Sequence, residues 1–186
     1  MNQYITTLAN QNTDLEQITQ LSRLNAYANV SEAERLDQGF ILWEYNVDLL
    51  SKMHQLAASV VVKHNDAVVG YALTALKEAA NFYDNLSLVI KQVENLDYLG
   101  RKIGDYNYYI MGQICIDKNH RGTGVFKQLY DGHKKYYQQK FDLMVTEIST
   151  SNHRSLKAHQ NYGFKTIHTY RDNLDEWNVV VLELNN

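Results

Sequence analysis

The chain has 186 residues, of which 45% are hydrophobic and 21% charged, a composition typical of one folded domain and unlike that of a disordered segment. The net charge of −3 arises from mixed signs without a basic run, so nothing in the chain is suited to neutralise the phosphate backbone of a nucleic acid. The only cysteine, Cys115, excludes an internal disulfide, and no apolar run is long enough to span a bilayer. We therefore expect one cytoplasmic domain over residues 1–186, with no nucleic-acid or membrane partner.

The N-terminal part of the chain has the apolar spacing of two helices. Residues 14–29 carry apolar side chains at helical intervals, with Thr13 and Asp14 available as caps. Gly39 can bend or split the second, longer helix, which is predicted from Ser31. Its apolar stripe follows alternating steps of four and three: Leu36, Phe40, Trp43, Val47 and Leu50.

Residues 59–100 are predicted to form a hairpin and then a helix. The runs 59–64 and 67–76 are β-branched or apolar, and Asn65-Asp66 between them favours the tight turn of an antiparallel hairpin. Between Asp84 and Gly100 the apolar spacing is helical again, and Gly100 is the predicted stop. The apolar positions of this helix are Leu86, Val89, Ile90, Val93 and Leu96.

The C-terminal half alternates strands and helices. A strand is predicted over residues 106–116, followed by a glycine-containing turn at 121–124 and a helix that ends at Lys140. The remaining predicted elements are a strand over 143–148, a helix over 152–162, and strands over 164–171 and 178–184. This order predicts an α/β or α+β sheet with helices packed on its faces.

The turn Arg121-Gly122-Thr123-Gly124 has the features of an anion-binding site. Its glycines allow successive backbone N–H groups to turn toward one point, and the helix that follows adds its unpaired N-terminal donors and its dipole. A pyrophosphate would be held there largely by main chain. About thirty residues later comes a second pattern with the spacing Asn152-x-x-Ser155-x-x-x-His159-x-x-x-Gly163-Phe164.

Together the two segments resemble the acetyl-CoA-binding motifs of the GNAT superfamily of N-acetyltransferases. The resemblance covers residues 67–184 and is strongest from Ile114 to Phe164. It implies a mixed, mostly antiparallel twisted sheet with helices on both faces. Residues 77–105, where the family usually has a short connection, then form a helical insertion between two central strands.

The resemblance also implies which residues bind acetyl-CoA. Residues 114–116 would splay from the neighbouring strand and pair with the pantetheine arm, beside Asn152 and Ser155. The full set of implied cofactor residues is Ile114, Cys115, Ile116, Arg121, Gly122, Thr123, Gly124, Val125, Phe126, Asn152 and Ser155. Phe126 departs from the family pattern, which prefers Gly or Ala there, so its ring must point away from the phosphates into the helix packing.

Two residues are candidates for the chemistry of acetyl transfer. His159 occupies a motif position where the family commonly has a tyrosine, and an imidazole that titrates near neutrality can protonate a departing thiolate. Glu147 precedes Asn152 by five residues, as a glutamate does in ribosomal-protein alanine acetyltransferases, and burial would raise its pKa and suit it as a general base. Cys115 is interpreted as a buried structural thiol, and the spacing of the histidines predicts no metal site.

The predicted function is transfer of an acetyl group from acetyl-CoA to a primary amine of a small molecule, peptide or protein, by direct attack in a ternary complex. The alternative is a non-catalytic acyl-CoA-binding or regulatory module of the same fold. The insertion over residues 77–105 has two interpretations. It covers the acceptor groove, or the apolar face of its helix packs on a second subunit in a homodimer.

Overall fold

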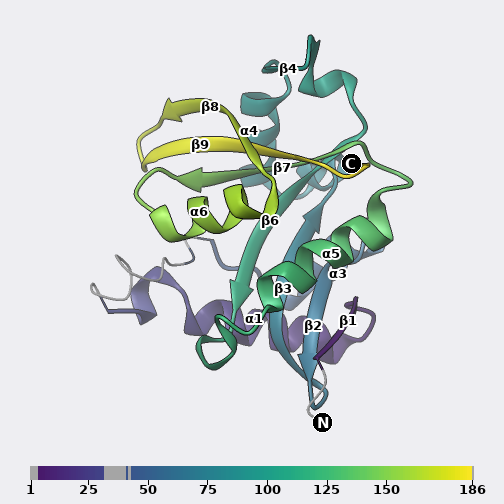
Figure 1. Ribbon diagram of the computed structural model, residues 1–186. Helices are drawn as coiled ribbons and strands as arrows, with labels where there is room; N and C mark the ends of the chain where they lie inside the picture. The colour runs from purple at the N-terminus through teal and green to yellow at the C-terminus, as the bar shows by residue number, and fades with distance from the viewer. Residues whose placement is uncertain (1–3, 32–40, 42, 186) are drawn as a thin grey trace.

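A seven-stranded mixed sheet organises the computed structural model, which describes residues 4–31, 41 and 43–185. Its strand order is β1-β2-β3-β6-β7-β9-β8, and every neighbouring pair is antiparallel except β6 and β7 (Figure 1). The strands are β1 (Tyr4–Leu8), β2 (Val60–His64), β3 (Ala67–Ala75), β6 (Tyr108–Ile116), β7 (Leu143–Ser149), β8 (Lys165–Arg171) and β9 (Glu176–Glu183). The predicted fold class is confirmed.

Helices cover both faces of this sheet. One face packs against α1 (Asn12–Leu24), α3 (Val47–Leu56) and α4 (Asp84–Val93), and the other against α5 (Val125–Tyr137) and α6 (His153–Tyr162). Alternate residues of a strand point to opposite faces, so Val145 of β7 is buried toward α4 while its neighbour Met144 is buried toward α5. Short 3₁₀ turns occupy Tyr27–Asn29, Lys77–Asn81, Ile103–Asp105 and Lys118–His120.

The hairpin of β2 and β3 forms as the sequence predicts. Asn65 and Asp66 have φ values of 50° and 64°, the left-handed conformation that a two-residue hairpin turn needs and that these residue types tolerate. Strand β1 was not predicted, because it has only five residues and these do not alternate between buried and exposed. Four of them are half-buried, and Ile5 is exposed.

The first two helices differ from their predictions in where they begin and end. Helix α1 begins at Asn12, and Asp14 lies inside its first turn, where its carboxylate accepts hydrogen bonds from the backbone N–H groups of Asn10 and Gln11. The helix ends at Leu24 rather than at residue 29.

Helix α3 begins only at Val47, where Asn46 caps it by accepting from the Leu49 N–H at 2.8 Å. Trp43 is therefore not helical, although the apolar stripe had placed it in a helix. The predicted stripe residues Leu36 and Phe40 lie outside the described residues.

The insertion over residues 77–105 joins β3 to β6, which are neighbours in the sheet. Its helix α4 ends at Val93, and the next residues form a small hairpin of β4 (Asp97–Tyr98) and β5 (Arg101–Lys102). Gly100, with a φ of 80°, lies in the turn of that hairpin, so its prediction as the helix stop was wrong.

The apolar face of α4 packs inside its own chain. Leu86, Val89, Ile90 and Val93 are all buried in the core on that side of the sheet. These four side chains are therefore unavailable to a second subunit, and the dimer interpretation of this face was wrong.

Candidate active site

The two central parallel strands separate after a short stretch of pairing. Strand β6 pairs with β7 only from Tyr108 opposite Leu143 to Ile110 opposite Val145. Beyond that point β6 continues along β3 to Ile116, whereas β7 continues along β9 to Ser149. A cavity of about 810 Å³ opens where they diverge, and both strands line it, with Ile114 on one side and Glu147 on the other. The splay implied by the family resemblance is present.

The glycine turn before α5 presents open backbone. Gly122 and Gly124 have φ values of 76° and 89°, and apart from the adjacent residues of the chain no atom lies within 4 Å of where a Cβ would stand on either residue. The first backbone N–H groups of α5 have no partner within the helix, as at any helix start. This turn is therefore a backbone surface that an anionic group can approach closely.

The side chains of this turn are directed elsewhere. The guanidinium of Arg121 donates to the Ile116 carbonyl at 3.2 Å and to the Asn25 side chain at 2.8 Å. The Phe126 ring packs edge-on against Tyr130 and His159, with centroid distances of 4.9 and 5.1 Å. The prediction that the Phe126 ring points into the helix packing is confirmed.

Helix α6 brings the second motif to the cavity. Asn152, Ser155 and His159 line it together with Ile114 of β6. The Asn152 side chain caps α6 by accepting from the Ser155 N–H at 3.1 Å. Asn152, Ser155 and Ile114 thus line the same cavity.

His159 is held by hydrogen bonds on both of its ring nitrogens. Its Nδ1 lies 2.7 Å from the Ser155 carbonyl, which can only accept, so Nδ1 carries the proton. Its Nε2 lies 2.6 Å from the Tyr130 hydroxyl and accepts from it. Burial lowers the pKa of His159 to about 4, so the imidazole is neutral at pH 7. Its one N–H points into its own helix, which argues against the expected role as proton donor to a thiolate.

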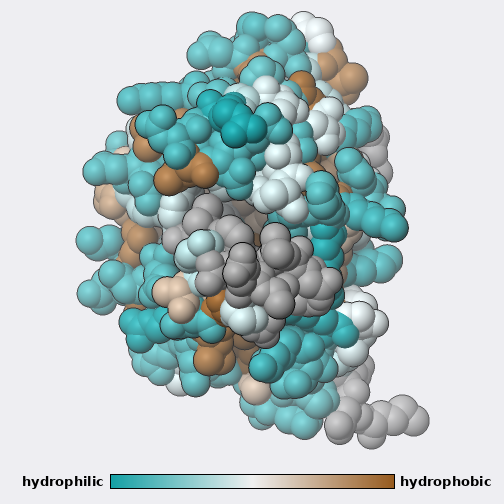
Figure 2. Space-filling view, turned by 90° about the vertical axis from the view of Figure 1, so that its left-hand side faces the viewer, coloured by the Kyte–Doolittle hydropathy of each residue, from teal (hydrophilic) through white to brown (hydrophobic). Residues whose placement is uncertain are grey.

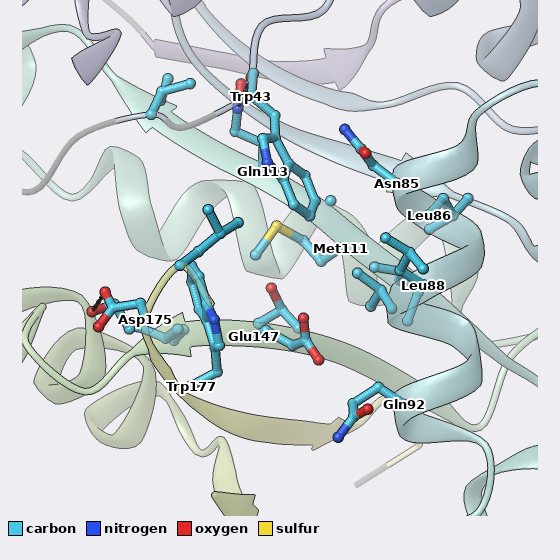
Figure 3. A pocket seen from close by; sticks show the side chains of 18 of the residues that line it. Trp43, Asn85, Leu86, Leu88, Gln92, Met111, Gln113, Glu147, Asp175 and Trp177 are labelled. Atoms are coloured by element: carbon cyan, nitrogen blue, oxygen red, sulfur yellow. Dashed lines mark hydrogen bonds between the residues drawn. The ribbon is translucent and has the colours of Figure 1, made fainter. Parts of the chain in front are cut away.

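Glu147 has the environment of a general base. It lies on β7, and its side chain lines the cavity. Burial is the main cause that raises the pKa of Glu147 to about 7. The hydrogen bond from the Tyr170 hydroxyl lowers this pKa, and the nearby Asp172 charge raises it. Tyr170 donates to Oε1 at 2.8 Å. Figure 3 shows the Glu147 carboxyl in the open part of the cavity, opposite Leu88 and Gln92 of α4. Near neutral pH this group can both hold and release a proton.

The remaining candidate residues lie outside the cavity wall. Cys115 is buried on the α1 side of β6, and burial raises the pKa of its thiol to about 12, so it is not a nucleophile at neutral pH. Ile116 and the Arg121–Phe126 turn follow Ile114 along the chain toward α5. Among the described residues no group of three or more His, Cys, Asp or Glu side chains is placed to hold a metal ion. No helix in the described ranges is long and apolar enough to cross a membrane.

Sequence analysis missed most of the wall opposite α6. Trp43, Leu88 and Trp177 line the cavity, each from a different part of the chain (Figure 3). The one usable signal was composition, because Trp43 and Trp177 are the only two tryptophans in the sequence and both lie here.

Comparisons with known proteins agree with this architecture. The ribosomal-protein-S18-alanine N-acetyltransferase from Escherichia coli is similar at a TM-score of 0.65 and 10% identity, over 99% of this chain and 96% of that one. A putative acetyltransferase from Salmonella typhimurium, solved with its cofactor acetyl-CoA, is similar at a TM-score of 0.64 and 15% identity, over 98% and 95% of the two chains. Naa50 from Arabidopsis thaliana, in complex with the bisubstrate analogue CoA-Ac-MVNAL, is similar at a TM-score of 0.64 and 14% identity, over 97% and 98%.

These three likenesses concern the fold alone. A search of curated proteins found no significant match. The family model described as Acetyltransferase (GNAT) family matches residues 15–164, which is most of the sequence and includes both motifs and Glu147. The chain therefore belongs to the GNAT acetyltransferase family, which comprises acetyl-CoA-dependent acyltransferases.

Proposed function

We propose that this protein transfers an acetyl group from acetyl-CoA to a primary amine by direct attack, with Glu147 as the general base. The amine nitrogen forms a bond to the acetyl carbonyl carbon, and the carbon–sulfur bond breaks with its electron pair on sulfur. One ammonium proton passes to Glu147 and then to solvent, and a second protonates the departing thiolate. The products are an N-acetylated amine and free coenzyme A.

The observation that carries this proposal is the position and pKa of Glu147. It stands on β7 two residues past the end of the β6–β7 pairing, in the cavity that also contacts Ile114 and Asn152. With a pKa of about 7, it is ionised in a substantial fraction of molecules at neutral pH. A buried carboxylate with a raised pKa takes a proton from an ammonium more readily than an exposed one would.

The turn before α5, outside the cavity wall, supports the same proposal. The open backbone at Gly122 and Gly124, together with the start of the 13-residue helix α5, suits a pyrophosphate. The unpaired part of β6 at Ile114 offers backbone groups to an extended ligand arm such as pantetheine. The structural relatives from Salmonella typhimurium and Arabidopsis thaliana were solved with acetyl-CoA and with a CoA-containing bisubstrate analogue, respectively.

The test is the release of free thiol from acetyl-CoA in the presence of a panel of primary amines. Glu147→Gln keeps the shape of the side chain and removes the base, so turnover is expected to fall about 10²- to 10⁴-fold. Stabilisation of the variant by acetyl-CoA in thermal unfolding should equal that of the parent. Glu176→Gln is the matched control, because Glu176 lies on the adjacent strand β9, outside the cavity wall, and pairs with Arg171.

Two results would contradict the proposal in different ways. Full activity of Glu147→Gln would mean that the base is another group. Stabilisation by acetyl-CoA without thiol release for any amine would favour the alternative, an acyl-CoA-binding module without catalysis. Initial rates should also indicate a ternary complex, since burial raises the pKa of the Cys115 thiol to about 12 and makes it a poor nucleophile at neutral pH.

A further inference from the structure

The α4 face of the sheet forms the part of the cavity that lies away from the α5 turn. In the sheet register Ser149 of β7 pairs with Trp177 of β9, which pairs with Tyr170 of β8, so these three residues share a face. Glu147 lies two residues before Ser149 and therefore points the same way. Figure 3 shows Glu147 and Trp177 on one side and Leu88 of α4 across from them. An acceptor amine that reaches Glu147 from this face must pass between these walls.

Aromatic side chains make up much of this chamber, and the backbone at Trp43 and the ring pair of Tyr45 and Tyr83 have defined contacts. The Trp43 carbonyl accepts from the Gln113 side chain at 2.8 Å, which anchors the Trp43 backbone to strand β6. Gln113 is itself held by the Tyr71 hydroxyl at 2.5 Å. Tyr45 packs against Tyr83 at a ring-centroid distance of 5.4 Å. Rigid aromatic walls of this kind favour a flat apolar ligand, because little side-chain entropy is lost when it binds.

Apolar side chains also border the cavity where it meets solvent. Leu88 of α4 is 64% exposed, Leu174 of the β8–β9 loop is 67% exposed and Tyr27 is 48% exposed, and all three line the cavity. They come from three separate segments of the chain. Figure 2 shows a mainly hydrophilic described surface on one side of the molecule, with hydrophobic side chains in separate groups. Exposed apolar side chains that gather around a cavity indicate a ligand with an apolar body.

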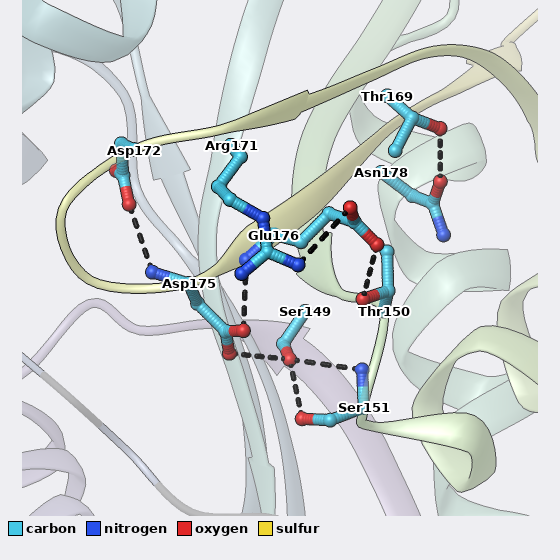
Figure 4. Close-up of polar contacts among 9 residues, drawn as sticks. All are labelled: Ser149, Thr150, Ser151, Thr169, Arg171, Asp172, Asp175, Glu176 and Asn178. Carbon is cyan, nitrogen blue, oxygen red and sulfur yellow. Dashed lines mark hydrogen bonds and ion pairs between the residues drawn. The ribbon is translucent and has the colours of Figure 1, made fainter.

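The acidic groups near the cavity mostly stabilise the protein's own loop. Asp172 accepts from the backbone N–H groups of Leu174 and Asp175 at 2.8 and 2.9 Å, and Asp175 accepts from the Ser149 hydroxyl at 2.6 Å (Figure 4). Glu147 is the carboxylate next to the point where β6 and β7 separate. The carboxylates of Asp172 and Asp175 line the cavity but are thus engaged with the protein's own loop, and polar side chains of α4, Asn85 and Gln92, line it as well.

We propose that the acceptor is a small primary amine attached to an apolar body of aromatic size, which packs between Trp43, Trp177 and Leu88 with its nitrogen at Glu147. This assignment rests on the proposed acetyl transfer. 2-Phenylethylamine is the simplest probe of this class, and ethylamine is the same molecule without the phenyl ring. Loss of the ring removes most of the apolar contact area, so kcat/KM for ethylamine is expected to be about 100-fold lower.

The first experiment measures thiol release with equal concentrations of 2-phenylethylamine, ethylamine, spermidine and glucosamine. The proposal requires the highest kcat/KM for 2-phenylethylamine. Leu88→Asn should reduce its advantage over ethylamine about 5- to 10-fold, because a polar group replaces apolar contact at the cavity edge. Leu99→Asn is the matched control, since Leu99 is 69% exposed in the same insertion but outside the cavity wall, and it should leave the ratio unchanged.

The second experiment measures binding without turnover. Both tryptophans of the chain line the cavity, so intrinsic tryptophan fluorescence reports directly on its occupation. Titration with 2-phenylethylamine should change this fluorescence in a saturable way, and ethylamine should not.

The outcomes separate this inference from the proposed function. Thiol release that is equally fast with ethylamine or faster with spermidine would overturn the acceptor class while leaving acetyl transfer intact. A saturable fluorescence change without thiol release from any amine would overturn acetyl transfer and support the chamber as a site for aromatic amines. The assignment would also be overturned if 2-phenylethylamine caused no fluorescence change and its kcat/KM did not exceed that of ethylamine.

Discussion

The two sides of the cavity are built in different ways. The side near α6 comes from one stretch of chain between Ile114 and Phe164, and the proposed anion-binding turn before α5, which lies outside the cavity wall, is open backbone at two glycines. The side toward α4 is assembled from side chains that are distant in sequence, among them Trp43, Leu88 and Trp177. The proposed cofactor side therefore depends on backbone conformation, whereas the proposed acceptor side depends on the identity of individual side chains.

This difference predicts which substitutions matter on each side. A change that strains the backbone should damage cofactor binding even when it removes no contact. None of the described residues that line the cavity has a positive φ, so on the proposed acceptor side only the removal of particular groups should alter catalysis. The predictions below test each half of that statement.

After Glu147→Gln, the largest effect is expected from Gly124→Val. Gly124 has a φ of 89° at the start of α5, and a β-branched residue at such an angle is strained by about 1–3 kcal/mol or shifts the turn. Affinity for coenzyme A should fall about 10- to 100-fold, and the thermal stabilisation by acetyl-CoA should fall with it. Isothermal titration and thermal unfolding measure the two quantities.

Gly100→Val is the matched control for Gly124→Val. Gly100 has a φ of 80° and, like Gly124, nothing within 4 Å of its Cβ position, but it lies in the β4–β5 turn away from α5. It should lose stability by a similar amount and keep its affinity for coenzyme A. Equal loss of affinity in both variants would mean that backbone strain acts through global stability and not at the cofactor turn.

The elements that carry the proposed cofactor site could be predicted from sequence because their determinants are local. The strand, glycine turn and helix from residue 106 to residue 140 follow one another without insertion, and the structure has β6 and α5 in those places. Glycines before a helix mark positive φ values directly, which Gly122 and Gly124 adopt. The ring of Phe126 could also be placed, since a bulky side chain has no room beside a ligand at that turn.

The acceptor side could not be predicted, because tertiary packing decides it. Trp43 fits the apolar period of a helix, yet α3 begins at Val47, where Asn46 supplies a cap. Nothing in the local sequence brings Trp43 and Trp177 to the same cavity. Trp177 reaches it because the register of β9 places it beside Ser149 at the end of β7. The role of His159 was also beyond the sequence, because its two hydrogen-bond partners, Tyr130 and the Ser155 carbonyl, are known only from the fold.

A smaller effect on turnover is expected from His159→Phe. His159 is neutral and uses both ring nitrogens in hydrogen bonds, so kcat should change less than about 10-fold, well below the effect of removing a proton-transfer group. The free energy of unfolding should fall by about 1–3 kcal/mol, because the buried Tyr130 hydroxyl loses its acceptor. Steady-state kinetics and denaturant unfolding provide these two values.

His133→Phe is the comparison for His159→Phe. His133 is equally buried and accepts or donates one hydrogen bond with Tyr109 at 2.9 Å, but it does not line the cavity. Both variants should behave alike in kinetics. If turnover falls by about 100-fold or more in His159→Phe alone, with unchanged affinity for coenzyme A, His159 is restored as the proton donor.

The smallest effect is expected from Tyr170→Phe, and it appears only in the pH dependence. The Tyr170 hydroxyl donates to Glu147 at 2.8 Å and thereby stabilises the carboxylate form, which lowers a pKa that burial raises to about 7. Removal of the hydroxyl leaves the burial in place, so the Glu147 pKa should rise further. The acid limb of kcat/KM against pH, which reports the free enzyme, should move upward by about one pH unit or less. Activity should therefore fall several-fold near pH 6 and be unchanged well above pH 8.

Tyr106→Phe serves as the control for this shift. Tyr106 is also a half-buried tyrosine with a hydrogen-bonded hydroxyl, but it donates to the Tyr98 carbonyl at 2.8 Å and does not line the cavity. Its pH profile should match that of the parent. If Tyr170→Phe loses the same fraction of activity at every pH, then Tyr170 shapes the acceptor chamber and does not tune Glu147. If the acid limb moves downward, the hydroxyl favours the protonated carboxyl, and the general-base assignment of Glu147 loses the support of this hydrogen bond.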